Sequence, residues 1–475
     1  MRQEQDKQKA AIKFTRVSFF SIVGLLLCLI IIVGVLTLVI PAGHYLTDDY
    51  GNITNYFVFQ ETQNRLPVWR WFTAPFEVWI FSNDSLTLIF LSLLLLIMGG
   101  SFYIIENTGG MKAIINAIIR RYSKNRYALI WATVFFFMLL AAVFGTFEDG
   151  LILLPIVMLM CKAMKWDNLT ALGMMLLAAG VGFSATLVNW WSIGLASYLA
   201  GTNVLTGIWL RIIVWLVLWV CTSLFVTYFF AKKAEKRNKE LGVTNNRTAL
   251  LKEIGEGSPE ETKKVKIFSF LFLIIFVIII ITYIVPTLVY YIMPIMCFIF
   301  LIGSIFCGNL LTKDIKVTLK YFSKGAITIA PAIIIIMMSL SIKYIAERGE
   351  ILHTIFFYFY ELTTRTGPYG TIILIYLVSF IFNFFIPSAS GKVMIVVPLL
   401  TLLPIEGVSK ELIILAVCLN EGFTDVFFPT SPVLLIGLSF ADVSYVTWFK
   451  KTVLFQILLF VISCAVLTLG VAIGY

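Results

Sequence analysis

We predict an all-α polytopic membrane protein from the sequence, on two observations. Hydrophobic residues make up 60% of the 475 residues and charged residues only 13%, with a mean hydropathy of +0.95. Apolar runs long enough to cross the roughly 30 Å hydrocarbon core of a bilayer as helices recur along the whole chain. Clusters of Pro, Gly, Ser and Thr interrupt several of these runs. Because irregular backbone at membrane depth survives only where protein covers it or water reaches it, we expect a polar cavity there.

The charge and motif content excludes several classes of function. The net charge of +10 comes from Lys and Arg in a few segments between apolar runs, where the positive-inside rule accounts for them without nucleic acid. The seven Cys form no CxxC pair, and His44 and His353 stand far apart, so we expect no metal site. No HExxH, GxSxG or GxxxxGK[ST] motif occurs, so we expect neither an enzyme nor a bound cofactor.

The first 85 residues predict one spanning helix and an outer loop. An apolar run over residues 18–40 follows five basic residues and lacks the small-residue cleavage site of a signal peptide. We therefore predict an uncleaved helix with its N-terminus in the cytoplasm. Residues 41–85 are acidic and aromatic, which is typical of an outer loop with an interfacial helix.

Residues 86–231 predict a first structural repeat. A span over residues 86–105 leads to an apolar segment, 127–164, which GTFED interrupts and basic residues flank on both sides. Because both ends carry a cytoplasmic signature, we predict a re-entrant hairpin that turns at GTFED. The run over residues 170–201 is too long for one span, and GFSATLVN in its middle predicts a helix that unwinds there. A span over residues 209–231 completes this repeat.

The second half of the chain follows the same pattern at an offset near 240 residues. Residues 232–266 predict a cytoplasmic linker, and residues 267–324 predict two linking spans. Residues 325–475 predict a second repeat, with a span over 326–345, a hairpin over 369–404 that turns at IPSASGK, and a helix over 411–443 that NEGFTDVFFPTS interrupts. One additional span before the second copy inverts it in the membrane. An inverted repeat with broken helices at the midplane is the recurrent plan of secondary transporters.

Polar residues of the two hairpin turns and the two unwound segments should converge on one binding site. Hydroxyl and amide groups can surround a polar solute, and Gly and Pro expose backbone carbonyls and the positive ends of half-helices. For Ser and Thr, helix capping or contact between helices is an equally good interpretation. The candidate substrate-binding residues are Thr146, Glu148, Asp149, Ser184, Thr186, Asn189, Ser388, Ser390, Gly391, Lys392, Asn420, Glu421, Thr424, Asp425, Thr430 and Ser431.

The acids among these residues constrain the charge of the substrate. A carboxylate at the centre of a spanning helix costs roughly 2.5 to 3.5 kcal/mol, so four of them need a cation nearby. Glu148, Asp149, Glu421 and Asp425 against Lys392 leave about three surplus negative charges if all are ionised. This surplus favours a cationic substrate, whereas protonation of the acids would remove it.

At these residues the sequence resembles the YfcC-type transporters of the ion transporter superfamily, which groups arginine/ornithine antiporters with four-carbon dicarboxylate carriers. The resemblance covers most of the chain from Pro41 on, and its most specific parts are IPSASGK, GFT followed by PTS, the pair Glu148 and Asp149, and GFSATLVN. Trp190 and Trp191 after Asn189, and Glu421 in place of Asp, depart from the family pattern. The resemblance implies an inner-membrane, elevator-type carrier, a homodimer in which hairpin-bearing domains move against a scaffold.

We therefore expect a secondary transporter of the bacterial plasma membrane that exchanges basic amino acids of the arginine and ornithine type. The alternative within this class is a carrier of four-carbon dicarboxylates or other organic anions, driven by a proton or sodium gradient. The expected partners are the lipid bilayer and a small-molecule substrate. We do not favour a membrane-embedded enzyme, because the sequence lacks the catalytic motifs that it would need. We also do not favour a channel, because an inverted repeat with two hairpins suits the alternating access of a transporter better.

Overall fold

The computed structural model describes residues 16–47, 53–60, 66–82, 85–122, 125–240, 257–284, 292–363, 366–401 and 407–475. The described chain is mainly helical and contains one two-stranded antiparallel sheet. Five of the described helices are long and apolar enough to cross a membrane, and a sixth span results if one bent pair is counted as a unit. The described chain is thus mainly helical, with helices of the length and composition that a polytopic membrane protein requires.

The N-terminal part agrees with the predicted span and adds a hairpin that the sequence analysis did not foresee. Helix α2 (Arg16–Val39) covers the predicted span, and α3 (Val68–Phe81) is the expected short helix of the following segment. Strands β1 (Gly43–Thr47) and β2 (Ile53–Phe59) pair between them. Their aromatic residues pack on α18 (Ile351–Thr363), where the rings of Phe57 and Phe357 stack 4.5 Å apart.

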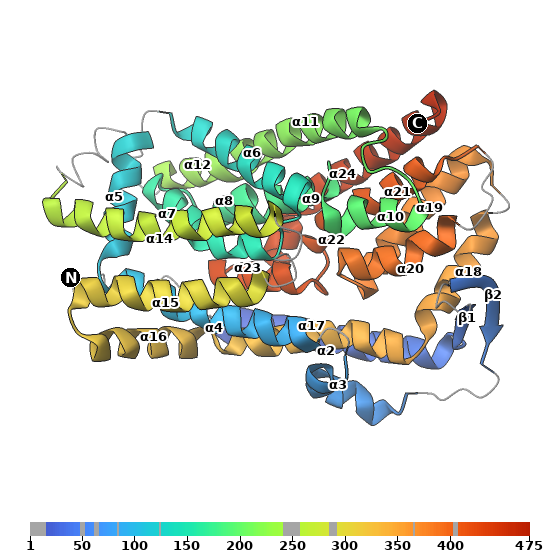
Figure 1. Ribbon diagram of the computed structural model, residues 1–475, viewed down its shortest axis with the longest axis horizontal. Helices are drawn as coiled ribbons and strands as arrows, with labels where there is room; N and C mark the ends of the chain where they lie inside the picture. Colours follow the sequence, from blue (N-terminus) through green and yellow to red (C-terminus); the bar gives the residue numbers. More distant parts are fainter. Residues whose placement is uncertain are drawn as a thin grey trace.

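Five helices form one layer of the molecule, along the lower edge of Figure 1. They are α2, α4 (Ser85–Asn107), α15 (Ile292–Thr312), α16 (Ile315–Ile329) and α17 (Pro331–Arg348). Helix α4 packs along α15 and α16, while α17 packs on α2 and α3.

The predicted span over residues 326–345 is not one straight helix. It divides between α16 and α17, which meet at 41° where Pro331 begins α17. Proline has no N–H for the helical hydrogen bond, and it restricts the backbone of the residue before it, so the bend falls at this position.

The second layer begins with the elements of the predicted first repeat, and two further helices connect it to the layer below. Helix α5 (Gly110–Tyr122) follows α4, and α14 (Pro259–Ile284) packs on both α5 and α15. The elements of the predicted first repeat in this layer are α6 (Arg126–Phe144), η1 (Asp149–Leu153), α7 (Leu154–Ala163), α8 (Asn168–Leu172), η2 (Gly173–Leu177), α9 (Ala178–Ser184), η3 (Trp190–Gly194), α10 (Leu195–Ala200), α11 (Ile208–Phe225) and η4 (Val226–Ala231). Helix α12 (Lys232–Glu240) follows in the predicted linker.

The same layer contains the elements after α18. They are α19 (Pro368–Phe385), α20 (Ala389–Thr401), α21 (Lys410–Leu419), α22 (Glu421–Asp425), α23 (Pro432–Ala441) and α24 (Tyr445–Ile473). Helix breaks fall at 145–148, 185–189, 386–388 and 426–431, within or directly beside the four interruptions that the sequence predicts. The two halves of the layer pack together where α9 contacts α22, α10 contacts α20, and α23 contacts α7 and α8.

Candidate functional site

The two interrupted helices cross at a pair of glycines in the middle of the second layer. A Cβ atom on Gly180 of α9 would lie 2.6 Å from the carbonyl oxygen of Gly422 in α22, so the backbones touch because both residues lack side chains. The Ser184 hydroxyl accepts a hydrogen bond from the backbone N–H of Phe423 (2.7 Å) and donates to the Gly180 carbonyl (3.2 Å). The two segments that the sequence predicts to unwind are therefore in direct contact.

The residues at the predicted first hairpin turn contact the first interrupted segment. Helix α6 ends at Gly145, whose left-handed backbone (φ 77°) reverses the chain. The Asn189 side-chain oxygen packs against this glycine, where an added Cβ would lie 2.5 Å away, and it accepts a hydrogen bond from the N–H of Trp191 (2.8 Å). Thr186 is buried beside Ser192, whose hydroxyl donates to it at 3.3 Å.

Two buried polar groups at this turn have no hydrogen-bond partner among the described residues. They are the Thr146 hydroxyl and the Asn189 side-chain NH2. An unsatisfied buried polar group costs about 1–3 kcal/mol, so each is a natural position for a substrate atom or a water molecule.

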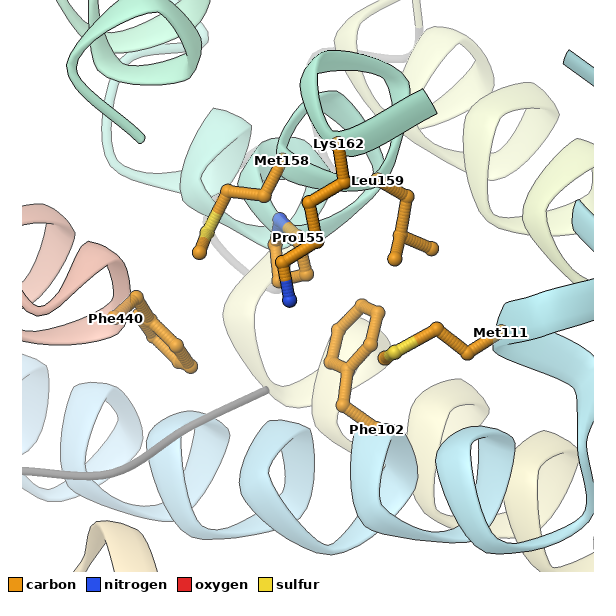
Figure 2. Close-up of a pocket in the computed structure, with 7 residues that line it drawn as sticks. All are labelled: Phe102, Met111, Pro155, Met158, Leu159, Lys162 and Phe440. Atoms are coloured by element: carbon orange, nitrogen blue, oxygen red, sulfur yellow. The ribbon is translucent and has the colours of Figure 1, made fainter. Parts of the chain in front are cut away.

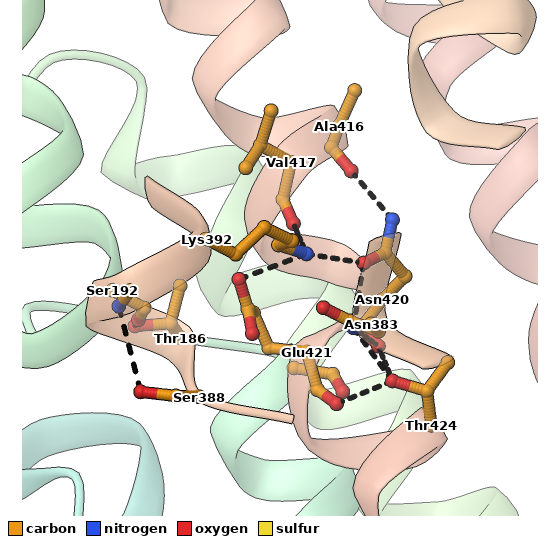
Figure 3. Close-up of polar contacts among 12 residues, drawn as sticks. Thr186, Ser192, Asn383, Ser388, Lys392, Ala416, Val417, Asn420, Glu421 and Thr424 are labelled. Atoms are coloured by element: carbon orange, nitrogen blue, oxygen red, sulfur yellow. Dashed lines mark hydrogen bonds and ion pairs between the residues drawn. The ribbon is translucent and has the colours of Figure 1, made fainter. Parts of the chain in front are cut away.

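Lys392 is the centre of the polar cluster in the second half (Figure 3). It lies in the first turn of α20 and is 0% exposed. Its ammonium contacts three oxygens, the Glu421 carboxylate at 2.9 Å, the Asn420 side-chain oxygen at 2.7 Å and the Val417 carbonyl at 3.1 Å. The contact with Glu421, itself 1% exposed, is an ion pair by distance rather than a directed hydrogen bond. The charge of Lys392 is therefore balanced inside the protein.

Asn383 holds this cluster together, although the sequence analysis did not select it. From the last turn of α19 its side-chain NH2 donates to the Asn420 backbone oxygen (2.9 Å), the Asn420 side-chain oxygen (3.0 Å) and the Thr424 hydroxyl (2.6 Å). The Thr424 hydroxyl donates to the Asn420 and Glu421 carbonyls. The signal was present, because an Asn in the last turn of an apolar helix before IPSASGK is a buried polar group that needs partners.

The remaining acids lie near this cluster. Asp425 is 7% exposed and stands four residues after Glu421, on the same side of the short helix α22. Glu148, half-buried at the predicted first hairpin turn, lies within electrostatic range of Asp425. The side chain of Asp149 lies outside the described residues. The structure thus brings an acid of the first hairpin turn to an acid of the second interrupted segment.

The other predicted residues have mainly local contacts. Gly391 donates its N–H to the Ser388 hydroxyl at 3.5 Å, and Ser390 is half-buried beside them. Ser431 caps α23 by accepting from the N–H of Leu434, which is the capping interpretation of this residue. The Thr430 carbonyl accepts a short hydrogen bond from Ser339 of α17, and its hydroxyl has no partner among the described residues.

Arg211 is a second buried cation that the sequence analysis missed. It lies in α11, is 2% exposed, and donates to the carbonyls of Leu187 (2.7 Å), Thr206 (3.3 Å) and Val204. Guanidinium groups have five donors and suit several acceptors at once. Arg211 therefore fixes the backbone of the first interrupted segment at Leu187, without a direct contact to the cluster around Lys392 in the part of the chain described.

One cavity between the layers is too small to hold a substrate. Phe102 of α4 and Met111 of α5 face it from one side, and Pro155, Met158, Leu159 and Lys162 of α7 with Phe440 of α23 face it from the other (Figure 2). Its volume of about 10 Å³ has room for one water molecule. Since Lys392, Glu421 and Asp425 are also shielded from solvent, the structure shows the polar cluster in a closed state.

Comparisons with known proteins identify the family. Residues 19–472 match the family model described as C4-dicarboxylate anaerobic carrier, DcuC. An Escherichia coli protein named "Putative basic amino acid antiporter YfcC" is 26% identical over 84% of this chain and 81% of its own length. A Haemophilus influenzae protein is 24% identical over 74% of this chain and 70% of its own length.

Two solved transporter structures are also similar over most of the chain. They are YdaH from Alcanivorax borkumensis (15% identity, TM-score 0.44, 96% of this chain and 98% of that one) and MtrF from Neisseria gonorrhoeae (14%, 0.41, 94% of each chain). The family match over nearly the whole sequence confirms the resemblance to YfcC-type proteins. The chain belongs to the DcuC family and is a multi-pass membrane transporter of the DcuC and YfcC type.

Proposed function

We propose that the protein is a secondary transporter that exchanges basic amino acids of the arginine and ornithine type. The observation that carries this proposal is that the positive charge of Lys392 is neutralised within the protein. Its ammonium contacts the Glu421 carboxylate and two further oxygens. Asp425, one turn further along α22, and Glu148 add two more acidic side chains to the same region. A guanidinium or ammonium group would stabilise the ionised form of Asp425, whereas an organic anion would be repelled by it.

The E. coli relative is named a basic amino acid antiporter, and this name supports the same class of substrate. The site residues proposed from the sequence keep their role in this proposal. Buried groups without partners, such as the Thr146 hydroxyl and the Asn189 NH2, would bind the polar ends of the amino acid.

We further propose an inverted repeat with two re-entrant hairpins as the framework for alternating access. The order of hairpin, interrupted helix and final helix is the same in α6 to α11 and in α19 to α24. The two layers contact each other mainly through α5 with α7, α17 with α23, and α18 with α19. Few contacts of this kind would allow the layer that contains the site to move against α4, α15, α16 and α17, as an elevator-type mechanism requires. A cytoplasmic N-terminus and a homodimer complete this proposal.

The second candidate is a carrier of four-carbon dicarboxylates or other organic anions. It is favoured by the family description and by the N-termini of α20 and α23, which begin beside Ser388 and at Ser431. The positive ends of two half-helices suit a carboxylate. In this case Lys392 would have to leave Glu421 and bind the substrate.

Uptake into proteoliposomes separates the two candidates. Vesicles that contain the purified protein are loaded with ornithine, with succinate or with buffer alone, and the entry of labelled arginine and labelled succinate is followed in each. Arginine entry that requires internal ornithine supports the exchanger. Succinate entry in vesicles that take up no arginine would refute it and favour the dicarboxylate carrier. Imposed proton or sodium gradients in the buffer-loaded vesicles then test for a coupling ion.

A further inference from the structure

The surroundings of the Lys392 ammonium have the composition of a site for a metal cation. A carboxylate oxygen, an amide oxygen and a backbone carbonyl lie within 3.1 Å of the nitrogen (Figure 3). These are the hard oxygen ligands that bind cations such as Na⁺, Mg²⁺ and Ca²⁺ in proteins. An ammonium has three hydrogen-bond donors and no acceptor, so three oxygen atoms satisfy all of its donors.

The orientation of the Asn420 side chain shows that its oxygen is held in place for a cation. Its NH2 donates to the carbonyls of Tyr376 (3.2 Å) and Ala416 (3.3 Å), so the amide cannot turn without placing its oxygen against two other oxygens. The Asn420 oxygen also accepts from Asn383, which fixes it from the other side. These bonds do not involve Lys392, and they would persist without its ammonium.

The position of the three oxygens on the fold adds to their attraction for positive charge. Helix α21 ends at Leu419 with Asn420 as its C-cap, and the Val417 carbonyl belongs to its last turn. The C-terminus of a helix carries partial negative charge, and the ends of broken helices coordinate the coupling ions of many transporters. A cation at this position is therefore stabilised by the helix as well as by Glu421.

We propose that Lys392 is a built-in cation, whose ammonium occupies a site that would otherwise bind Na⁺. The protein then neutralises Glu421 without a metal ion, and its transport cycle does not depend on Na⁺. Removing the ammonium exposes the three oxygens and creates a Na⁺ site at the end of α21. This inference rests on the proposed exchange of cationic substrates, in which Lys392 stays paired with Glu421.

Thermal unfolding of purified variants in detergent tests the inference without any substrate. Wild type, Lys392→Ala and Lys392→Gln are each measured in NaCl and in choline chloride at equal ionic strength. We expect NaCl to raise the Tm of Lys392→Ala by about 3 °C or more, with saturation as NaCl increases. Wild type should show no such shift. Lys392→Gln is the matched control, because its amide is neutral but its side chain fills part of the space beside these oxygens, so its NaCl shift should be smaller than that of Lys392→Ala.

Two further measurements complete the test. The double variant Lys392→Ala with Glu421→Gln loses the anionic ligand and should lose the Na⁺ shift. Wild-type transport should proceed at the same rate in choline chloride as in NaCl. Three results would each overturn the inference. They are a folded Lys392→Ala protein whose Tm does not change with Na⁺, a Lys392→Ala protein that cannot be recovered in either salt, and wild-type transport that requires Na⁺. A failure of the substrate assay alone would instead refute the proposed exchange and leave the Na⁺ result unchanged.

Discussion

The crossing of α9 and α22 predicts a large effect for the smallest substitution, Gly180→Ala. The new Cβ would lie 2.6 Å from the Gly422 carbonyl oxygen and 2.6 Å from the nearest methyl of Val426. Ordinary contacts begin at 3.4 Å, so the helices must separate by about 0.8 Å. Overpacking of this kind costs about 1–3 kcal/mol, and the atom that must move is backbone rather than a flexible side chain.

The separation would also disturb the site, because the Ser184 hydroxyl bonds the N–H of Phe423 directly beside the crossing. We expect Gly180→Ala to lower the Tm in detergent by at least ~2 °C and to reduce uptake into proteoliposomes at least ~10-fold. Gly24→Ala is the matched control, since its Cβ would meet nothing within 4 Å and alanine is the better helix former. A Gly180→Ala protein with the Tm and uptake of wild type would refute the close crossing.

Three further predictions test the charged and polar groups. Asp425→Asn should abolish arginine exchange without changing the Tm. Asp314→Asn, at the N-cap of α16, should keep both the exchange and the Tm of wild type, because Asn caps a helix equally well. Wild-type exchange by Asp425→Asn would remove this acid from the site. Asn383→Ala leaves two buried oxygens of Asn420 without this donor and should lower the free energy of unfolding by about 1–3 kcal/mol. Asn107→Ala, at an exposed position, should lower it by less. Equal losses of stability in the two variants would contradict the role of Asn383. Glu77 lies outside the spanning helices, and the hydrogen bond from Arg70 lowers the pKa of its carboxyl below the ordinary value of 4.5. The ionised carboxyl therefore stabilises the fold at pH values above 4.5, and this stabilisation is lost as the pH falls through the folded pKa. Between about pH 5 and pH 3 the Tm of wild type should therefore fall more than that of Glu77→Gln, and parallel curves would contradict this assignment.

Hydropathy and breaks in the apolar runs predicted most of the helices, because both follow from what a bilayer permits. The first span and the interruptions at GTFED, GFSATLVN, IPSASGK and NEGFTDVFFPTS correspond to observed helices and breaks. The bend at Pro331 was readable but was overlooked within a uniformly apolar run. The β-hairpin could not be distinguished from loop, since strands of five and seven residues carry little periodic signal.

The polar cluster was predicted in its members but not in its pairing. Lys392 and Glu421 were expected in one site, yet their ion pair depends on how α20 packs against the end of α21, which no spacing in the sequence reveals. Arg211 was missed for a related reason, because its acceptors are backbone carbonyls and carry no residue-specific signal.

The two proposed repeats differ in the charged residues that they contribute to the site. At the offset of 240, Glu148 corresponds to Ser388, and Asp425 corresponds to Ala185. Each acid therefore has an uncharged counterpart, although the backbone elements follow the same order. Glu148 nevertheless lies within electrostatic range of Asp425, although the two acids come from different halves of the chain. The acidic groups of the site are therefore distributed asymmetrically, and we expect a basic amino acid to bind in one orientation, with its side-chain cation toward Glu148 and Asp425.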